Sequence, residues 1–111
     1  MPFTPEQLLT FAARKGDATL VRERVEAGAD PLHGAALLES ARLGHLEVIE
    51  TLVELGADVN VQDERGFGAL EYALRWGRED AARLLLERGA KLSHHSRPHW
   101  QEQVARLLKQ D

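Results

Sequence analysis

The chain has 111 residues, which is enough for one domain and too short for two ordinary ones. It contains no cysteine, and this excludes disulfides, thiolate metal sites and a cysteine nucleophile. The 14 basic and 18 acidic residues give 14 − 18 = −4, a balance that argues against a nucleic-acid binder. No stretch approaches the roughly 18 apolar residues that a membrane-spanning helix needs. We therefore expect a soluble, cytoplasmic protein without membrane association.

A helix start signal opens the chain. Thr4 is suited to the N-cap position, Pro5 to the first helical position, and Gln7 stands three residues after the cap, as in a capping box. Phe3 and Leu8 have the spacing of a hydrophobic staple. The sequence predicts a helix that begins at Pro5.

Two series of glycines show that the chain repeats. The first series ends the stretches AARKG, SARLG and ALRWG at Gly16, Gly44 and Gly77. The second lies within EAGAD, ELGAD and ERGAK at Gly28, Gly56 and Gly89. Both series step by 28 residues (44 − 16) and then by 33 (77 − 44), so the chain holds three copies of one supersecondary unit.

Each copy contains two predicted helical segments. The first has small residues on its apolar side, which lets helices approach closely: Leu9, Ala12, Ala13; Leu37, Ser40, Ala41; Leu70, Ala73, Leu74. The second has apolar residues at helical spacing: Leu46, Ile49, Leu52, Val53; Ala81, Leu84, Leu85. The second series of glycines falls where a helix would end in a left-handed residue.

The end of the chain is predicted to be an amphipathic helix. Its apolar residues are Trp100, Val104, Leu107 and Leu108. Its polar side carries Gln101, Glu102, Gln103, Arg106, Lys109 and Gln110. One apolar and one polar face are what a terminal cap of a stacked array requires.

The middle copy, SARLGHLEVIETLVELGADVNVQDERG, resembles the ankyrin repeat. It has a glycine-histidine break at Gly44 and His45, GADVN at 56–60, and an aspartate-x-x-glycine finger at 63–66. The resemblance covers about residues 5–95. It implies an all-α fold, an α-solenoid of three ankyrin-type helix-turn-helix repeats plus a C-terminal capping helix. The single domain would span 1–111, with repeats at about 5–33, 34–66 and 67–97 and the capping helix at about 98–110.

The copies depart from the family at the start of the first helix of each repeat. The family's threonine-proline-leucine-histidine is replaced by QLLT at 7–10, AALL at 35–38 and GALE at 68–71. The hydrogen bonds that this threonine and histidine supply in the family are therefore not predicted here.

The loop between the first two copies is short. From Gly28 to Ala35 the chain advances 7 residues (35 − 28), against 12 from Gly56 to Gly68 (68 − 56), so five residues are missing. Either the finger is deleted and the helix begins near Gly34, or the helix begins at Pro31 with Asp30 as its cap. We favour the start at Pro31, because Asp-Pro is a good helix start signal. Both alternatives leave one full finger, at 60–67.

In the ankyrin family, one face of the first helices lines a concave groove that meets partners. The corresponding positions here are Phe11, Arg14, Lys15, Glu39, Arg42, Leu43, Tyr72, Arg75 and Trp76. The finger adds Gln62, Glu64, Arg65 and Phe67. Four groove cations and one carboxylate give 4 − 1 = +3, and Trp, Tyr and Arg are enriched where binding energy concentrates. We expect a lopsided interface that uses the third copy and the finger most.

The predicted function is noncatalytic protein–protein interaction through the groove and finger, with a partner that has an acidic surface. No cofactor is expected, and the protein is expected to be a monomer or to self-associate weakly. The sequence has no glycine-rich phosphate loop, GxSxG or HExxH motif. One alternative is a metal-binding or sequestering protein that uses His94, His95 and His99. The other is an accessory subunit that stabilises a neighbouring protein.

Overall fold

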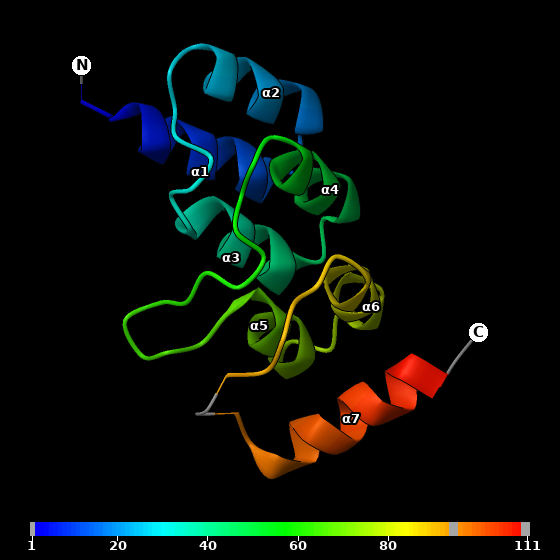
Figure 1. Ribbon diagram of the computed structural model, residues 1–111. Coiled ribbons are helices and arrows are strands. Elements are labelled where there is room, and N and C mark those ends of the chain that lie inside the picture. The colour runs from blue at the N-terminus through cyan, green and yellow to red at the C-terminus, as the bar shows by residue number, and fades with distance from the viewer. Residues whose placement is uncertain (1, 94–95, 110–111) are drawn as a thin grey trace.

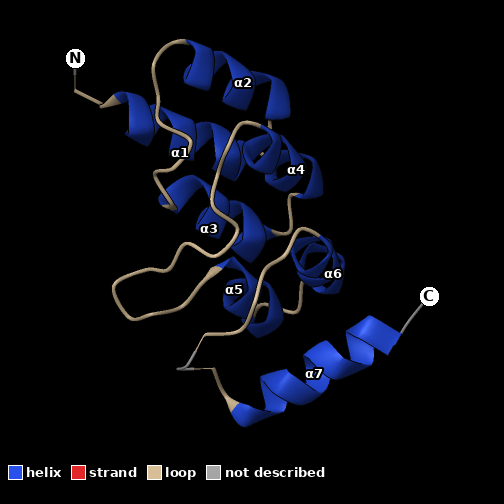
Figure 2. Cartoon of the chain, in the orientation of Figure 1, coloured by secondary structure: helices blue, strands red, loops and turns tan. Residues whose placement is uncertain are grey.

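The computed structural model describes residues 2–93 and 96–109, and within them every regular element is a helix (Figure 2). The helices are α1 (Pro5–Lys15), α2 (Ala18–Glu26), α3 (Ala35–Leu43), α4 (Leu46–Glu54), α5 (Ala69–Arg75), α6 (Glu79–Glu87) and α7 (Pro98–Lys109). None of these described helices is long and apolar enough to cross a membrane.

The helices form two layers (Figure 1). Helices α1, α3 and α5 stack as an inner layer, α2, α4 and α6 stack beside them as an outer layer, and α7 packs on α5 and α6. The inner helices meet through fully buried small side chains, among them Ala12, Ala41 and Ala73. Stacking draws the molecule out to 45 × 29 × 20 Å, and the all-α solenoid predicted from the repeats is confirmed.

The predicted helix signals are confirmed at both ends of the repeat units. The Thr4 hydroxyl accepts from the backbone N–H of Gln7 (3.1 Å), and the backbone N–H of Thr4 donates to Gln7 Oε1 (2.9 Å). Gly28 and Gly56, which follow the C-caps of α2 and α4, have φ of 115° and 107°, values that favour glycine. Phe3, which was predicted to form a hydrophobic staple with Leu8, packs edge-on against Phe11, with ring centroids 5.1 Å apart.

The prediction that the second inner helix begins at Pro31 is wrong. Helix α3 begins at Ala35 after Gly34, which is the shorter alternative. The Asp30 carboxylate caps a single turn, accepting from the N–H of Leu32 (2.9 Å), while the Asp30 carbonyl accepts from the N–H of His33 (3.0 Å). The backbone N–H of Asp30 donates to Glu6 in α1 (3.0 Å), so contact with the first repeat fixes the turn.

The side chains that follow Gly44 and Gly77 each link their repeat to the preceding one. His45 Nε2 donates to the Arg14 carbonyl (3.0 Å), and Arg78 Nε donates to the Arg42 carbonyl (3.0 Å). Each bond satisfies a carbonyl near the end of the preceding inner helix, where no intrahelical donor exists. A Cβ on Gly16 would lie only 2.8 Å from the His45 ring, so this close link requires glycine.

Glu71 supplies a link at the place where the family has histidine. Its side chain is 1% exposed. The carboxylate accepts from the backbone N–H of Gly68 (2.7 Å), the backbone N–H of Ser93 (2.7 Å) and the hydroxyl of Ser96. A buried carboxylate is tolerated only when it is hydrogen-bonded, so Glu71 ties the start of α5 to the segment that leads into α7.

Helix α7 covers the end of the stack, with a phase that differs from the predicted one. Trp100 and Leu107 are buried and Val104 is partly buried, as predicted. Leu108, which was assigned to the apolar side, is 65% exposed, whereas Gln103, which was assigned to the polar side, is half-buried. The packed stripe is therefore rotated relative to the apolar pattern.

The neighbouring leucines of α7 provide a matched test of the cap. Leu107→Ala removes a buried side chain and should lower the free energy of unfolding by about 2–5 kcal/mol. Leu108→Ala should change it by no more than about 0.5 kcal/mol, because that side chain is 65% exposed. Urea denaturation followed by circular dichroism measures both, and equal losses would show that α7 does not cap the stack.

Candidate functional site

The groove face of α3 and α5 meets the base of the finger in a hollow of about 280 Å³, called here the groove hollow. All six lining residues belong to the predicted interface: Glu39, Arg42, Arg65, Tyr72, Arg75 and Trp76. Trp76, the C-cap residue of α5, is 50% exposed. The structure thus brings together two aromatic rings, three guanidinium groups and one carboxylate from elements distant in sequence.

The arginine ladder of the groove is organised by Glu39. Its carboxylate accepts from Nε (3.0 Å) and Nη2 (2.7 Å) of Arg42, and it lies 3.7 Å from Nε of Arg14 on α1. The guanidinium of Arg42 also lies over the Trp76 ring, 5.7 Å from its centroid. Arg75 is exposed and makes no polar contact with the described residues, so its charge is available to a ligand.

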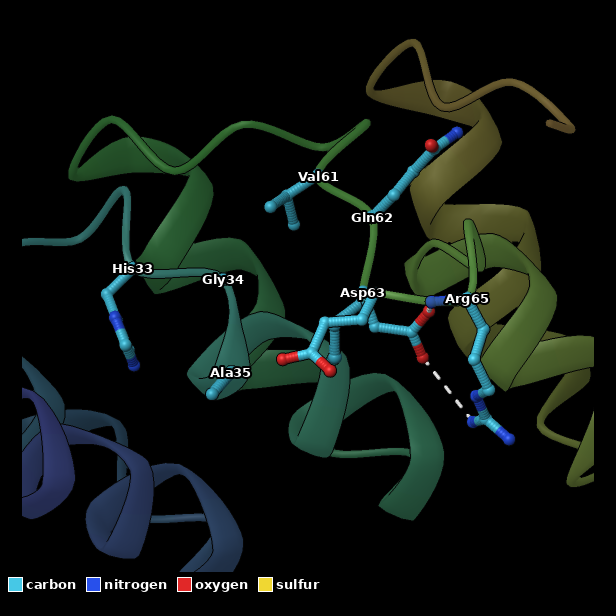
Figure 3. A pocket seen from close by; sticks show the side chains of 9 residues that line it. His33, Gly34, Ala35, Val61, Gln62, Asp63 and Arg65 are labelled. Carbon is cyan, nitrogen blue, oxygen red and sulfur yellow. Dashed lines mark hydrogen bonds and ion pairs between the residues drawn. The ribbon is translucent and has the colours of Figure 1, made fainter.

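Asp63 organises the finger. One carboxylate oxygen accepts from the backbone N–H groups of Arg65 (2.9 Å) and Phe67 (3.0 Å). The other accepts from the Tyr72 hydroxyl. The same oxygen lies 3.4 Å from Nη2 of Arg65, and Figure 3 shows this ion pair. Because Tyr72 belongs to α5, the Asp63 carboxylate holds the finger against the inner layer.

The pKa values in this cluster follow from these bonds. Burial alone would raise the pKa of Asp63, but hydrogen bonds from Tyr72, Phe67 and Arg65 outweigh it and hold the pKa below the usual 3.8. Burial, and then the hydrogen bond to Asp63, raise the pKa of the Tyr72 hydroxyl. Hydrogen bonds to Tyr72 and Asp63 raise the pKa of Arg65. Asp63 and Arg65 are therefore both charged, and the Tyr72 hydroxyl neutral, over the whole physiological range.

Other predicted interface residues lie outside the groove hollow. On α1, Phe11 packs against Phe3 and has the Arg14 guanidinium 5.9 Å from its centroid, while Lys15 is exposed. Leu43 lines a separate hollow, of about 350 Å³, beside the start of α6. Phe67 lies beneath Arg65 and edge-on to Trp100 of α7, with ring centroids 6.2 Å apart.

Gln62 and Glu64 line a third hollow, called here the notch (Figure 3). It measures about 470 Å³ and lies between the short loop before α3 and the outgoing limb of the finger. Its lining residues are His33, Gly34, Ala35, Leu38, Val61, Gln62, Asp63, Glu64 and Arg65. Val61 closes the inner end, because a Cβ on Gly34 would lie 2.5 Å from Val61 Cγ2.

Sequence reasoning predicted Gln62, Glu64 and Arg65 of the notch, and it missed the other residues that line it: His33, Gly34, Ala35, Leu38, Val61 and Asp63. The Asp-x-x-Gly pattern at 63–66 signalled a turn, but the bond from Asp63 to Tyr72 spans 9 positions and has no sequence signature. The five missing residues did signal a gap beside the finger. They could not show that His33 and Ala35 would line it.

The predicted histidine cluster falls partly outside the described residues. His94 and His95 lie outside them, and His99 is exposed in the first turn of α7, with its ring centroid 5.7 Å from that of Trp100. Within residues 2–93 and 96–109, no group of three or more His, Cys, Asp or Glu side chains is arranged to hold a metal ion.

A family model described as ankyrin repeats, in three copies, matches residues 9–96. The chain belongs to the ankyrin repeat family. It is 37% identical over 94 residues to mouse protein phosphatase 1 regulatory subunit 27, covering 79% of this chain and 61% of that protein. It is 39% identical over 96 residues to mouse ankyrin repeat and SAM domain-containing protein 6, covering 85% of this chain and 10% of that protein.

A third relative, mouse protein phosphatase 1 regulatory subunit 12A, is 41% identical over 54 residues, which cover 49% of this chain and 5% of that protein. The chain thus spans only part of each of these three relatives. Three ankyrin repeats and relatives named as regulatory subunits together point to a domain for protein–protein interaction rather than to an enzyme.

Acid should loosen the finger before it unfolds the stack. Because the pKa of Asp63 is lowered in the folded state, its contribution to stability is complete above the unfolded value of 3.8 and is lost as the pH falls through the lower folded value. The amide resonances of Arg65 and Phe67 should therefore shift with a midpoint below pH 3.8. Asp63→Asn should abolish that titration, and a midpoint above 3.8 would contradict the assignment.

Proposed function

We propose that this chain is a noncatalytic module that binds a partner protein through the groove and the finger, and that the partner presents an acidic segment to the groove. The observation that carries the proposal is the groove hollow, where the exposed ring of Trp76 lies beside Arg42 and beside Arg75, which has no partner among the described residues. Large aromatic area and forked guanidinium donors are the features that dominate binding energy at protein interfaces.

The geometry supports an acidic ligand over an apolar one. Arg42 is held in place by Glu39 and Trp76, so a carboxylate that binds it meets an ordered donor and loses little entropy. Arg75 lies on the same wall and adds a positive charge that has no carboxylate partner among the described residues. The charges of Arg42 and Arg65 are partly offset by Glu39 and Asp63, at 2.7 Å and 3.4 Å.

The relatives support a regulatory role for such a module. Two of them are named as regulatory subunits of protein phosphatase 1, and protein phosphatase 1 is therefore the first purified candidate to test. The chain covers 5% and 61% of these two proteins, so the proposal rests on the groove hollow and not on their names.

Charge reversal at Arg75 tests the groove. Arg75→Glu should weaken capture of the partner on the order of tenfold, mainly through a slower association rate and a changed salt dependence. Its melting temperature should match that of the wild type, because Arg75 has no bond to lose among the described residues. Pull-down identifies a partner, and surface plasmon resonance then measures its association rate and the salt dependence of binding. A thermal unfolding curve gives the melting temperature.

Lys109→Glu is the matched control. It makes the same change in net charge on an exposed residue that ends α7 and does not line the groove hollow. If Arg75→Glu fails to capture the partner and Lys109→Glu still captures it, the result supports binding through the groove. A partner lost equally with both variants would place the interface elsewhere.

A further inference from the structure

The short loop leaves the finger without a neighbour on one side. The turn at 30–34 is closed on itself by the Asp30 carboxylate and carbonyl, which accept from Leu32 and His33. It therefore offers no extended backbone to the finger across the notch. Figure 3 shows Val61 directed toward Gly34, while the Gln62 side chain points the opposite way, as in an extended segment.

The outgoing limb of the finger has the hydrogen-bonding pattern of an edge strand. Gln62 pairs with Gly68 in an isolated antiparallel bridge, and the N–H of Asp63 donates to the Phe67 carbonyl (2.8 Å). Gln62 therefore occupies the non-hydrogen-bonded position, whose N–H and C=O point away from the returning limb. Within the described part of the chain, the N–H of Gln62 has no acceptor. Such an edge is a template for another extended chain.

We infer that an extended segment of the partner protein binds in the notch and pairs with the backbone of Gln62, in the place of the missing first finger. This rests on the proposed function, since it assumes that the domain binds a protein. Backbone pairing supplies affinity in this mode of recognition, and side-chain pockets supply specificity. A small molecule fits less well, because such ligands are normally enclosed over most of their surface and the notch is open.

The lining of the notch defines the chemistry of the segment. Ala35, Leu38 and Val61 give it an apolar floor, and Leu38 is buried. On the rim, the charges of Asp63 and Arg65 face each other and balance, whereas the exposed Glu64 has no partner among the described residues. The segment therefore carries an apolar residue toward the floor and a Lys or Arg toward Glu64. This differs from the acidic chemistry proposed for the groove.

Substitutions at Gln62 separate backbone pairing from side-chain recognition. A phage-displayed library of linear peptides is selected on the wild-type chain, and the enriched peptides are titrated calorimetrically. Gln62→Pro removes the N–H and should weaken the notch-binding peptides on the order of tenfold. Gln62→Ala, the matched control, keeps the N–H and should leave their affinity within about twofold. Equal losses from both variants would overturn the proposal.

A loop graft tests the notch without touching the finger. Residues 31–34 are replaced by the sequence of residues 59–67, which restores the five missing residues (9 − 4 = 5) and fills the space with a first finger. Circular dichroism and the melting curve establish that the graft folds. Peptides that bind in the notch should lose all measurable affinity for it. Full retention by the graft would overturn the proposal.

The charge of the rim gives a third measurement. Selection on Glu64→Lys should enrich Asp or Glu in place of Lys or Arg, because the rim charge is reversed. If the selected peptides lose affinity for Arg75→Glu but not for the graft, the notch proposal is contradicted and the groove proposal is not. If the peptides bind Arg75→Glu and the graft as tightly as the wild type, both proposals are contradicted.

Discussion

Close contact between the inner helices is the constraint on which the rest of the structure depends. A two-helix repeat cannot bury its apolar side alone, and so each repeat is stable only against its neighbours. In this chain the inner helices meet through alanine and serine side chains, with Ala12, Ser40, Ala41 and Ala73 fully buried. A larger residue there would push the repeats apart. The groove hollow and the notch depend on that spacing, because the residues that line each of them come from different repeats.

The links that set the register of the stack differ from those of the family's usual start motif. His45 and Arg78 each bond to a carbonyl of the preceding repeat, and Asn60 bonds across to the third, accepting from Lys91 N–H (2.8 Å). The Glu71 carboxylate links α5 to the segment before α7, because it accepts from the N–H of Ser93 and the hydroxyl of Ser96. Each of these bonds gives a backbone or hydroxyl group a partner in a neighbouring repeat or helix, and those made by Glu71 are partly buried, which offsets the cost of removing these groups from water.

The sequence predicted what is decided locally. The Thr4 capping box, the glycines that follow the outer helices and the three-fold repeat depend on neighbouring residues, and all were read correctly. The start of α3 was predicted wrongly, because an Asp-Pro pair begins a single turn as readily as it begins a helix. The choice is made by Glu6 and Val61, which lie 24 and 27 positions away (30 − 6 and 61 − 34).

The candidate site was predictable only in part, for the same reason. Helical periodicity placed Arg42, Tyr72, Arg75 and Trp76 on one face, and the structure brings them together. Periodicity carries no information on pairing, so the engagement of Arg42 with Glu39 and the bond from Tyr72 to Asp63 could not be foreseen. The sequence also did not predict which face of α7 packs on the stack. The way α7 docks on α5 and α6 turns Gln103 toward the stack and leaves Leu108 exposed, against the helix's own apolar pattern.

Arg65 connects the two proposed binding surfaces, since it lines both the groove hollow and the notch. Its guanidinium lies 3.4 Å from both the Asp63 carboxylate and the Tyr72 hydroxyl, and its carbon lies 5.4 Å from the centroid of Phe67. A carboxylate bound in the groove would compete with Asp63 for this cation. A segment bound in the notch would pack against the finger backbone that Asp63 holds in place. Any change that one ligand makes in the Asp63–Arg65 pair alters the affinity for the other, and by linkage the two effects are equal.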